Sequence, residues 1–262
     1  MSELYCGDVN PGEVVDESRV GGIRVPSDTV EIFELIKPGD YAEPLIHRSM
    51  RVTSGLCLDR SDEAHDEFLY VLEGSARFSF TDASGAYELR EGSAVHIQAG
   101  RAWNLAVENS AWLLSFLIPA PGTPWADALA KQTGKVVDVA ELGAQAAETA
   151  SSDRQFEVLF DASRGSRGAT MFVGFIPTSG APEHYHLYDE ICVIVGGSGI
   201  LKCRGIDQKL RKGSAFHVAP RLLHALENPN PEDLWVLGVF RPEGSAAAAF
   251  YPDGTPAPNN EE

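Results

Sequence analysis

One short stretch of the chain concentrates the residue types that bind metals. Residues 183–190, EHYHLYDE, contain two of the seven histidines and end at Glu190. Residues two apart on an extended strand point to the same face, so the rings of His184 and His186 share a side, and Glu190 keeps this parity. His224 lies in a later segment that an antiparallel strand can bring opposite them. Three imidazoles and one carboxylate suit Fe(II), Mn(II), Ni(II), Co(II) or Zn(II). The spacing therefore predicts a metal site.

Strand patterns dominate two regions of the chain, about residues 32–119 and 156–240. Runs such as FLYVLEG and ICVIVGG combine β-branched and aromatic residues with flanking turn residues, which is typical of β-sandwiches and β-barrels. Residues 125–155 are rich in Ala and Glu, which predicts a linker with one or two short helices. Both ends, about residues 1–28 and 241–262, are rich in Gly, Pro and acids, and we expect them to run over the surface.

The two strand regions repeat each other. GSAVHI at residues 92–97 matches GSAFHV at residues 213–218, 121 positions later. Glu67 and Glu190 each precede an apolar run that ends in Gly, and they are 123 positions apart. A hairpin that is two residues longer in the first half explains why the two offsets, 123 and 121, differ. We therefore predict a tandem duplication with one indel. Its segments are a first barrel, a linker and a second barrel: 29–124, 125–155 and 156–243.

The predicted ligands resemble the two-part motif of the cupin superfamily. Its first part is His-x-His, three or four residues, Glu, six residues and Gly, and residues 184–197 match it. Its second part ends in Gly, two residues, His, three residues and Asn, and here His224 and Asn228 match. The chain departs from the motif at three turn positions: Thr178, Ala219 and Arg221. The resemblance covers about residues 30–240. It implies an all-β bicupin with two double-stranded β-helix (jelly-roll) barrels and four metal ligands: His184, His186, Glu190 and His224.

The first half has lost most of this ligand set. At the repeat offsets, Ser61, Glu63 and Trp103 stand where the second half has its three histidines, and only Glu67 remains. An indole cannot ligate a metal. We therefore expect one metal per chain, in the second barrel, with the first barrel either structural or holding an organic ligand against Trp103. A site made of Glu63, His65 and Glu67 stays open as an alternative.

Resemblance to metal cupins implies small-molecule chemistry, although a fold alone does not define a reaction. The resemblance implies O2-dependent cleavage by non-haem Fe(II) as one of the commonest outcomes, so we favour a non-haem Fe(II) dioxygenase. Four protein ligands would leave two positions of an octahedral ion for substrate and O2. Mn(II), Ni(II) and Zn(II) stay open as the ion. The alternatives are a redox-neutral aminohydrolase, isomerase or decarboxylase, as in the bicupin ureidoglycine aminohydrolases, and a non-enzymatic cupin that binds a small ligand. Tyr188 has site-facing parity and is the candidate catalytic acid, base or hydrogen-bond donor, with packing as its other role.

The composition indicates a folded protein with a small-molecule partner. Apolar residues make up 44% of the 262 residues, and a formal net charge of −17 argues against nucleic acid and membrane partners. The N-terminal residues lack the features of a signal peptide, so a cytoplasmic protein is expected. The four cysteines are expected to be reduced, with Cys192 packed as a small apolar residue. His96 and His217 are expected to be polar residues whose hydrogen bonds are satisfied. Pairing of cupin barrels between chains, as a homodimer, also stays open.

Overall fold

The computed structural model describes residues 9–37, 44–120, 134–150 and 153–258 of the chain. Among these residues the regular elements are β-strands and two short 3₁₀ helices, Glu17–Arg19 and Ala162–Arg164, which confirms the all-β prediction. Within the same ranges, no helix has the length and apolar character that crossing a membrane would require.

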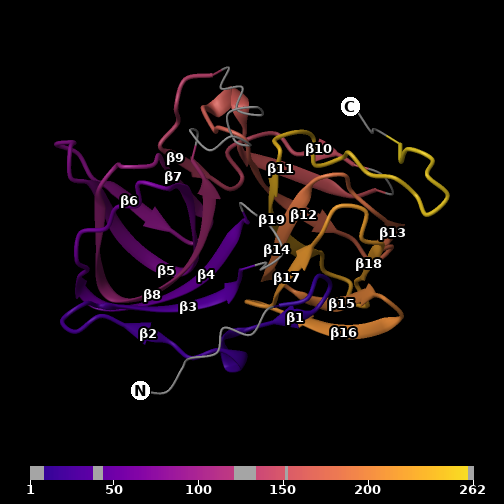
Figure 1. Cartoon of the computed structure of the whole chain (residues 1–262), viewed down its shortest axis with the longest axis horizontal. Coiled ribbons are helices and arrows are strands. Elements are labelled where there is room, and N and C mark those ends of the chain that lie inside the picture. The colour runs from indigo at the N-terminus through magenta and orange to yellow at the C-terminus, as the bar shows by residue number, and fades with distance from the viewer. Residues whose placement is uncertain (1–8, 38–43, 121–133, 151–152, 259–262) are drawn as a thin grey trace.

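An eight-stranded antiparallel sheet contains the strands of the first half (Figure 1). Its strands in spatial order are β2 (Ile23–Arg24), β3 (Val30–Ile36), β4 (Ile46–Leu56), β8 (Trp103–Pro119), β5 (His65–Phe80), β7 (Ser93–Ile97) and β9 (Val139–Glu141), with β6 (Tyr87–Arg90) paired to β5. The long strands β5 and β8 pair from His65 opposite Pro119 to Phe80 opposite Trp103. The side chains of Phe78, Phe80 and Trp103 belong to one buried core on this sheet.

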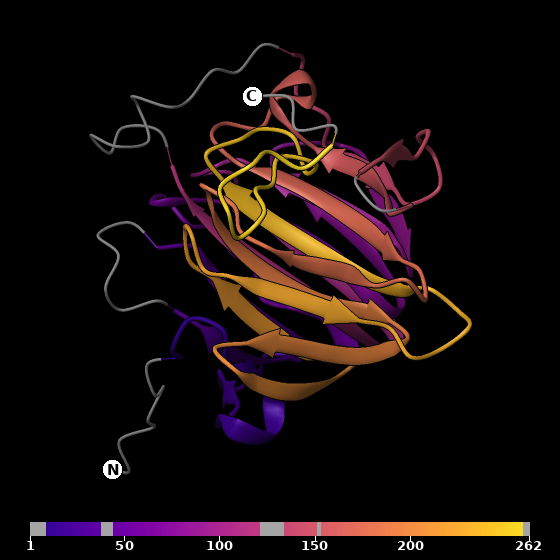
Figure 2. The same cartoon turned by 90° about the vertical axis from the view of Figure 1, so that its right-hand side faces the viewer.

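Two sheets that share a core make up the second half, which faces the viewer in Figure 2. The seven-stranded sheet runs in the order β1 (Val14–Val15), β17 (Ala215–Val218), β14 (Asp189–Gly196), β19 (Leu234–Arg241), β12 (Thr170–Ile176), β11 (Gln155–Phe160) and β10 (Glu148–Thr149). The four-stranded sheet runs in the order β13 (Ala181–His184), β18 (His224–Glu227), β15 (Ser198–Cys203) and β16 (Ile206–Arg211). Ile194 and Phe216 of the larger sheet meet Leu201 of the smaller one in this core.

Strand β14 is apolar on both faces because it separates two cores. Ile191 and Val193 join a core that contains residues of both halves of the chain. Cys192 and Ile194 point the other way, into the core of the second half. Since side chains alternate along a strand, Glu190 lies on the same side as Cys192. The strand thereby positions one carboxylate inside the second half.

The predictions for the chain ends and the linker were partly wrong. Near the N-terminus, β1 pairs with β17 and buries Val15, so this segment attaches to the second half. Near the C-terminus, Ala247, Ala249 and Ala257 are buried as well. The described part of the linker, residues 134–150 and 153–155, contains β9 and β10 and no helix, because these segments pair with β7 and β11 as strands. The rest of the expected helical region, residues 121–133, lies outside the described residues.

Candidate metal centre

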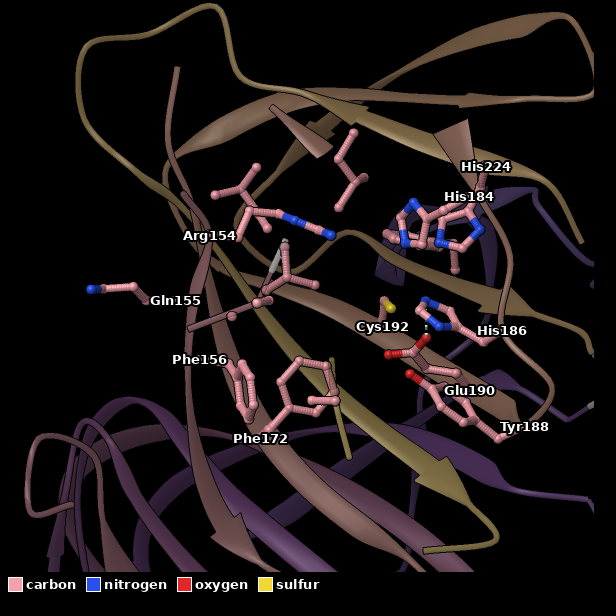
Figure 3. A pocket seen from close by; sticks show the side chains of 17 residues that line it. Arg154, Gln155, Phe156, Phe172, His184, His186, Tyr188, Glu190, Cys192 and His224 are labelled. Atoms are coloured by element: carbon pink, nitrogen blue, oxygen red, sulfur yellow. Dashed lines mark ion pairs between the residues drawn. The ribbon is translucent and has the colours of Figure 1, made fainter. Parts of the chain in front are cut away.

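Three histidines come together inside the second half (Figure 3). His184 ends β13 and pairs with His224 of β18, and His186 follows two residues later. The ring centroids are 4.4 Å apart for His184 and His224, and 4.8 Å apart for His184 and His186. One ring nitrogen of each histidine lies within 4.8 Å of the others, and all three residues are buried. The strand pairing thus brings together the three imidazoles whose spacing suggested a site.

Backbone carbonyls hold all three imidazoles in the same tautomer. The Nδ1 atoms of His184, His186 and His224 lie 2.7, 2.7 and 3.0 Å from the carbonyl oxygens of Pro182, Ala248 and Leu222. A carbonyl only accepts, so each Nδ1 carries the proton and donates it. Each Nε2 therefore keeps a lone pair, which is the form that ligates metals. Together with a carboxylate, this nitrogen set fits a divalent transition metal.

Burial determines the protonation of the site. It lowers the pKa of His186 to about 3 and the pKa of His224 to about 4, with nearby positive charge adding to the effect. Burial and the two neighbouring histidines also hold the pKa of His184 well below its usual value. Burial raises the pKa of Glu190 to about 7, and its Oε2 lies 3.8 Å from Nε2 of His186. At neutral pH the imidazoles are therefore uncharged, and Glu190 is near its midpoint.

A tight turn before β18 supports two of the histidines. Arg221 donates its backbone N–H to the carbonyl oxygen of His186 at 2.7 Å, and Leu222 donates to the carbonyl oxygen of Ala219 at 3.0 Å. Arg221 has a φ of 66°, in the left-handed region that favours the glycine usual at this motif position. The turn therefore keeps its contacts despite the departure at Arg221, at a conformational cost of about 1 kcal/mol.

Tyr188 stands at the edge of the site. Its ring stacks on His186 at a centroid distance of 4.6 Å and on Phe240 at 4.0 Å. Its hydroxyl is buried and has no hydrogen-bond partner among the described residues. Burial raises the pKa of Tyr188 well above its usual value, so the hydroxyl keeps its proton. Tyr188 lines the same pocket as Glu190 and could donate a hydrogen bond to a ligand there.

The remaining walls of the pocket are mostly apolar and come partly from segments outside the repeats. The apolar walls on the strands are Phe156, Phe172, Ile176, Phe216, Leu226 and Val236. Arg154, which precedes β11, and Ala246, in the C-terminal segment, also line the pocket. The C-terminal segment further supplies the carbonyl oxygen of Ala248 that holds His186. The repeat pattern carried no signal for Arg154 or Ala248, because neither lies within a repeated strand.

The first half fills the equivalent position with an indole. Trp103 is 2% exposed and stacks on Phe78 at a centroid distance of 5.5 Å. It also lines a cavity of about 100 Å³, together with Ser61 and Glu67. His65 places its Nδ1 3.0 Å from Oδ2 of Asp62. In the described ranges, the histidine triad is the single group of three or more metal-ligating side chains that come close together, so Glu63, His65 and Glu67 do not form one.

Three further residues singled out from the sequence are buried, His217 and Cys192 in the second half and His96 in the first. His217 places its Nε2 2.5 Å from Oδ1 of Asp189, as expected for a satisfied polar residue. Its repeat counterpart His96 lies 4.0 Å from Asp66, and neither of its ring nitrogens has a hydrogen-bond partner among the described residues, so the expectation was wrong for His96. Cys192 is a buried free thiol that lines the pocket beside Glu190. Its own pKa is raised well above its usual value by burial, which keeps the thiol protonated.

Comparison with known proteins identifies the fold. Residues 171–240 match the family model of the cupin domain. Oxalate decarboxylase from Bacillus subtilis, solved in work on its Mn(II) centres, has 15% sequence identity and a TM-score of 0.65 over 92% of this chain and 80% of that one. Protein Ylba from E. coli has 11% identity and a TM-score of 0.69 over 90% of this chain and 94% of that one. No curated protein matches the sequence. The chain thus has a cupin-like jelly-roll fold, and its residues 171–240 match the model of the cupin domain.

Proposed function

We propose that this chain is a metal-dependent cupin enzyme that acts on a small molecule. The observation that carries the proposal is the set of three buried imidazoles whose Nδ1 atoms are all committed to backbone carbonyls, with Glu190 beside them. In this proposal His184, His186, Glu190 and His224 hold one divalent ion per chain, with Fe(II) favoured and Mn(II), Ni(II) or Zn(II) as alternatives.

We also propose that the chain is a bicupin with the barrels and linker predicted from its repeat. The strand registers support this division. Glu67 pairs with Ile97 in the first half, and Glu190 pairs with Val218 in the second, at the same two offsets found in the sequence. The first barrel would then be a structural partner, because Trp103 occupies the position of His224.

For the reaction, we propose oxygen-dependent cleavage of a small substrate, with a redox-neutral reaction such as decarboxylation as the second candidate. A bound ion would supply positive charge and open coordination positions to the substrate. The chain's own contribution would be an apolar, buried pocket that limits water and the Tyr188 hydroxyl, which can donate a hydrogen bond or a proton to a substrate oxygen. The Tyr188 hydroxyl, as a proton donor, and the similar fold of an oxalate decarboxylase are the observations that keep decarboxylation as the second candidate, behind oxygen-dependent cleavage.

Metal analysis tests the site before any substrate is known. Protein purified without added metal and then loaded with Fe(II), Mn(II) or Zn(II) should hold one ion per chain. His186→Ala should lower occupancy sharply, whereas the control Trp103→Phe should leave it unchanged, because it keeps an aromatic side chain in the core. Two ions per chain, or full occupancy in His186→Ala, would contradict the assignment.

Oxygen dependence then separates the reaction classes. The Fe(II) and Zn(II) forms should be compared on small hydroxy acids, diketones and aromatic compounds, with O2 uptake followed by an electrode. Uptake by the Fe(II) form alone supports a dioxygenase. Equal turnover of a substrate by the Zn(II) form under nitrogen would reject it in favour of redox-neutral chemistry. Saturable binding of a compound without turnover by any form would indicate a ligand-binding protein.

A further inference from the structure

Arg154 brings a positive charge to the pocket of the three histidines. It precedes β11, and its guanidinium points toward the imidazoles (Figure 3). The backbone N–H of Ala150 donates to the carbonyl oxygen of Arg154 at 2.9 Å, which ties the residue into the hairpin of β10 and β11. Burial lowers the pKa of Arg154, but a guanidinium remains charged in proteins. A fixed cation therefore lines the candidate site.

The charges around this pocket favour an anionic ligand. Among its described lining residues, Glu190 is the only acid and Arg154 the only arginine or lysine. A divalent ion held by uncharged imidazoles and one carboxylate would leave, with Arg154, about two positive charges in excess. The nearby walls, such as Phe156 and Phe172, are apolar and screen these charges poorly. The pocket would be locally positive in a chain whose net charge is −17.

The shape of the guanidinium and the size of the cavity narrow the class of anion. A guanidinium is a planar fork that matches the two oxygens of a carboxylate, whereas a lysine ammonium is a point charge. The cavity volume is about 60 Å³, room for roughly four water molecules. We infer that Arg154 binds the carboxylate of a small carboxylic acid substrate and directs the rest of the molecule toward the imidazoles and Tyr188. This inference rests on the metal site proposed above.

Co(II) spectroscopy of the full-length protein tests the inference without catalysis. The visible bands of bound Co(II) respond to ligands, so titrations with acetate and its neutral counterpart acetamide report binding at the site. Wild type should bind acetate saturably and prefer it to acetamide. Arg154→Met should weaken acetate binding by about tenfold to hundredfold, the loss expected for a hydrogen bond between charged groups, and acetamide binding much less.

Two more variants keep the test decisive. Arg154→Lys retains the charge but loses the fork, so its acetate affinity should fall between those of wild type and Arg154→Met. The control Gln155→Met changes the adjacent residue, whose side chain points away from the imidazoles (Figure 3), and should match wild type. Circular dichroism shows whether each variant folds. If Arg154→Met does not fold, the acetate affinity of Arg154→Lys is compared with that of wild type instead.

The outcomes distinguish the two proposals. Acetate affinity at the wild-type level in the folded Arg154 variants, or wild type with no preference for acetate, overturns the role of Arg154 while the metal site stands. Co(II) stoichiometry is measured first. A wild-type protein that does not bind one Co(II) per chain overturns the metal site, and the inference about Arg154 with it.

Discussion

Acidification from pH 8 to pH 5 should weaken metal binding through Glu190 alone. Protons compete with a metal for its ligands, so affinity falls only where a ligand takes up a proton. The pKa of Glu190 is about 7, whereas burial lowers the pKa of His186 to about 3 and that of His224 to about 4. Below pH 7 the protein must therefore release one proton from Glu190 for each ion bound, and the imidazoles release none.

The slope of the pH dependence gives the magnitude. One competing proton weakens affinity about tenfold per pH unit, so the Kd at pH 5 should be about a hundredfold higher than at pH 8, or about 2.7 kcal/mol. Imidazoles with an ordinary pKa of about 6.5 would add up to three more protons, and the slope would approach about four decades per pH unit. A shallow slope is thus the consequence of burying the histidines, and it should steepen only near pH 4.

Calorimetric titration with Mn(II) or Zn(II) from pH 8 to pH 5 measures the slope, and buffers of different ionisation enthalpy count the protons released. Glu190→Gln should bind more weakly than wild type but without pH dependence in this range. Circular dichroism should accompany each titration. As the pH falls below about 6.5, these histidines take up protons in the unfolded state but not in the folded state, so the free energy of unfolding falls until the pH reaches their folded pKa values. A wild-type slope of about three decades or more per pH unit, or an unchanged slope in Glu190→Gln, would refute the reasoning.

Contacts around the site lead to three further predictions. In the metal-free protein, Glu190→Gln should raise the free energy of unfolding by about 3 kcal/mol at pH 8, because moving the pKa from 4.5 to about 7 costs about 1.4 kcal/mol per pH unit. Both states are protonated below about pH 4.5, so urea unfolding should show the gain vanish there, and a gain that persisted would contradict this explanation. Phe250→Ala should lower metal affinity about tenfold, because Phe250 stacks on Tyr185 at 5.4 Å and its segment carries the carbonyl that orients His186. Phe250→Leu should lose less affinity in the same calorimetric titration, and equal losses would argue against packing as the cause. Arg221→Gly should stabilise the protein by about 0.5 to 1 kcal/mol with metal affinity unchanged, and thermal unfolding that showed destabilisation would exclude backbone strain at this turn.

The parts of the structure that follow from side-chain alternation could be predicted from the sequence. The run from Glu190 to Ile194 is buried on both faces, and its alternation placed Glu190 and Cys192 on one side, as the structure has them. The spacing of His184 and His186, and the position of His224 in a later strand, likewise led to the group that lies within 4.8 Å. These features depend on local geometry, which a residue pattern records.

The features that the sequence did not reveal depend on backbone groups and on segments outside the repeated strands that come back to the site. The carbonyl of Ala248 has no signature in residue type, yet it holds the tautomer of His186. Arg154 reaches the pocket through a hairpin in the region expected to be a helical linker. The shallow pH dependence arises in the same way, because the low pKa of His186 comes chiefly from its burial in the folded chain.

Among the differences between the two repeats, one residue on the neighbouring strand changes the surroundings of each buried carboxylate. Glu67 and Glu190 occupy equivalent positions, and so do Ser115 and Gly238, which pair with the residues two beyond each glutamate. In the first half the hydroxyl of Ser115 donates to Oε1 of Glu67 at 2.5 Å. In the second half Gly238 offers no hydroxyl, and a Cβ there would lie 2.8 Å from Oε1 of Glu190 and contact Phe172 as well. One carboxylate is therefore tied to its own sheet by a hydroxyl beside Trp103. Glu190 instead meets the weaker thiol donor of Cys192 and lies 3.8 Å from Nε2 of His186, which is why the chemistry is expected in the second half alone.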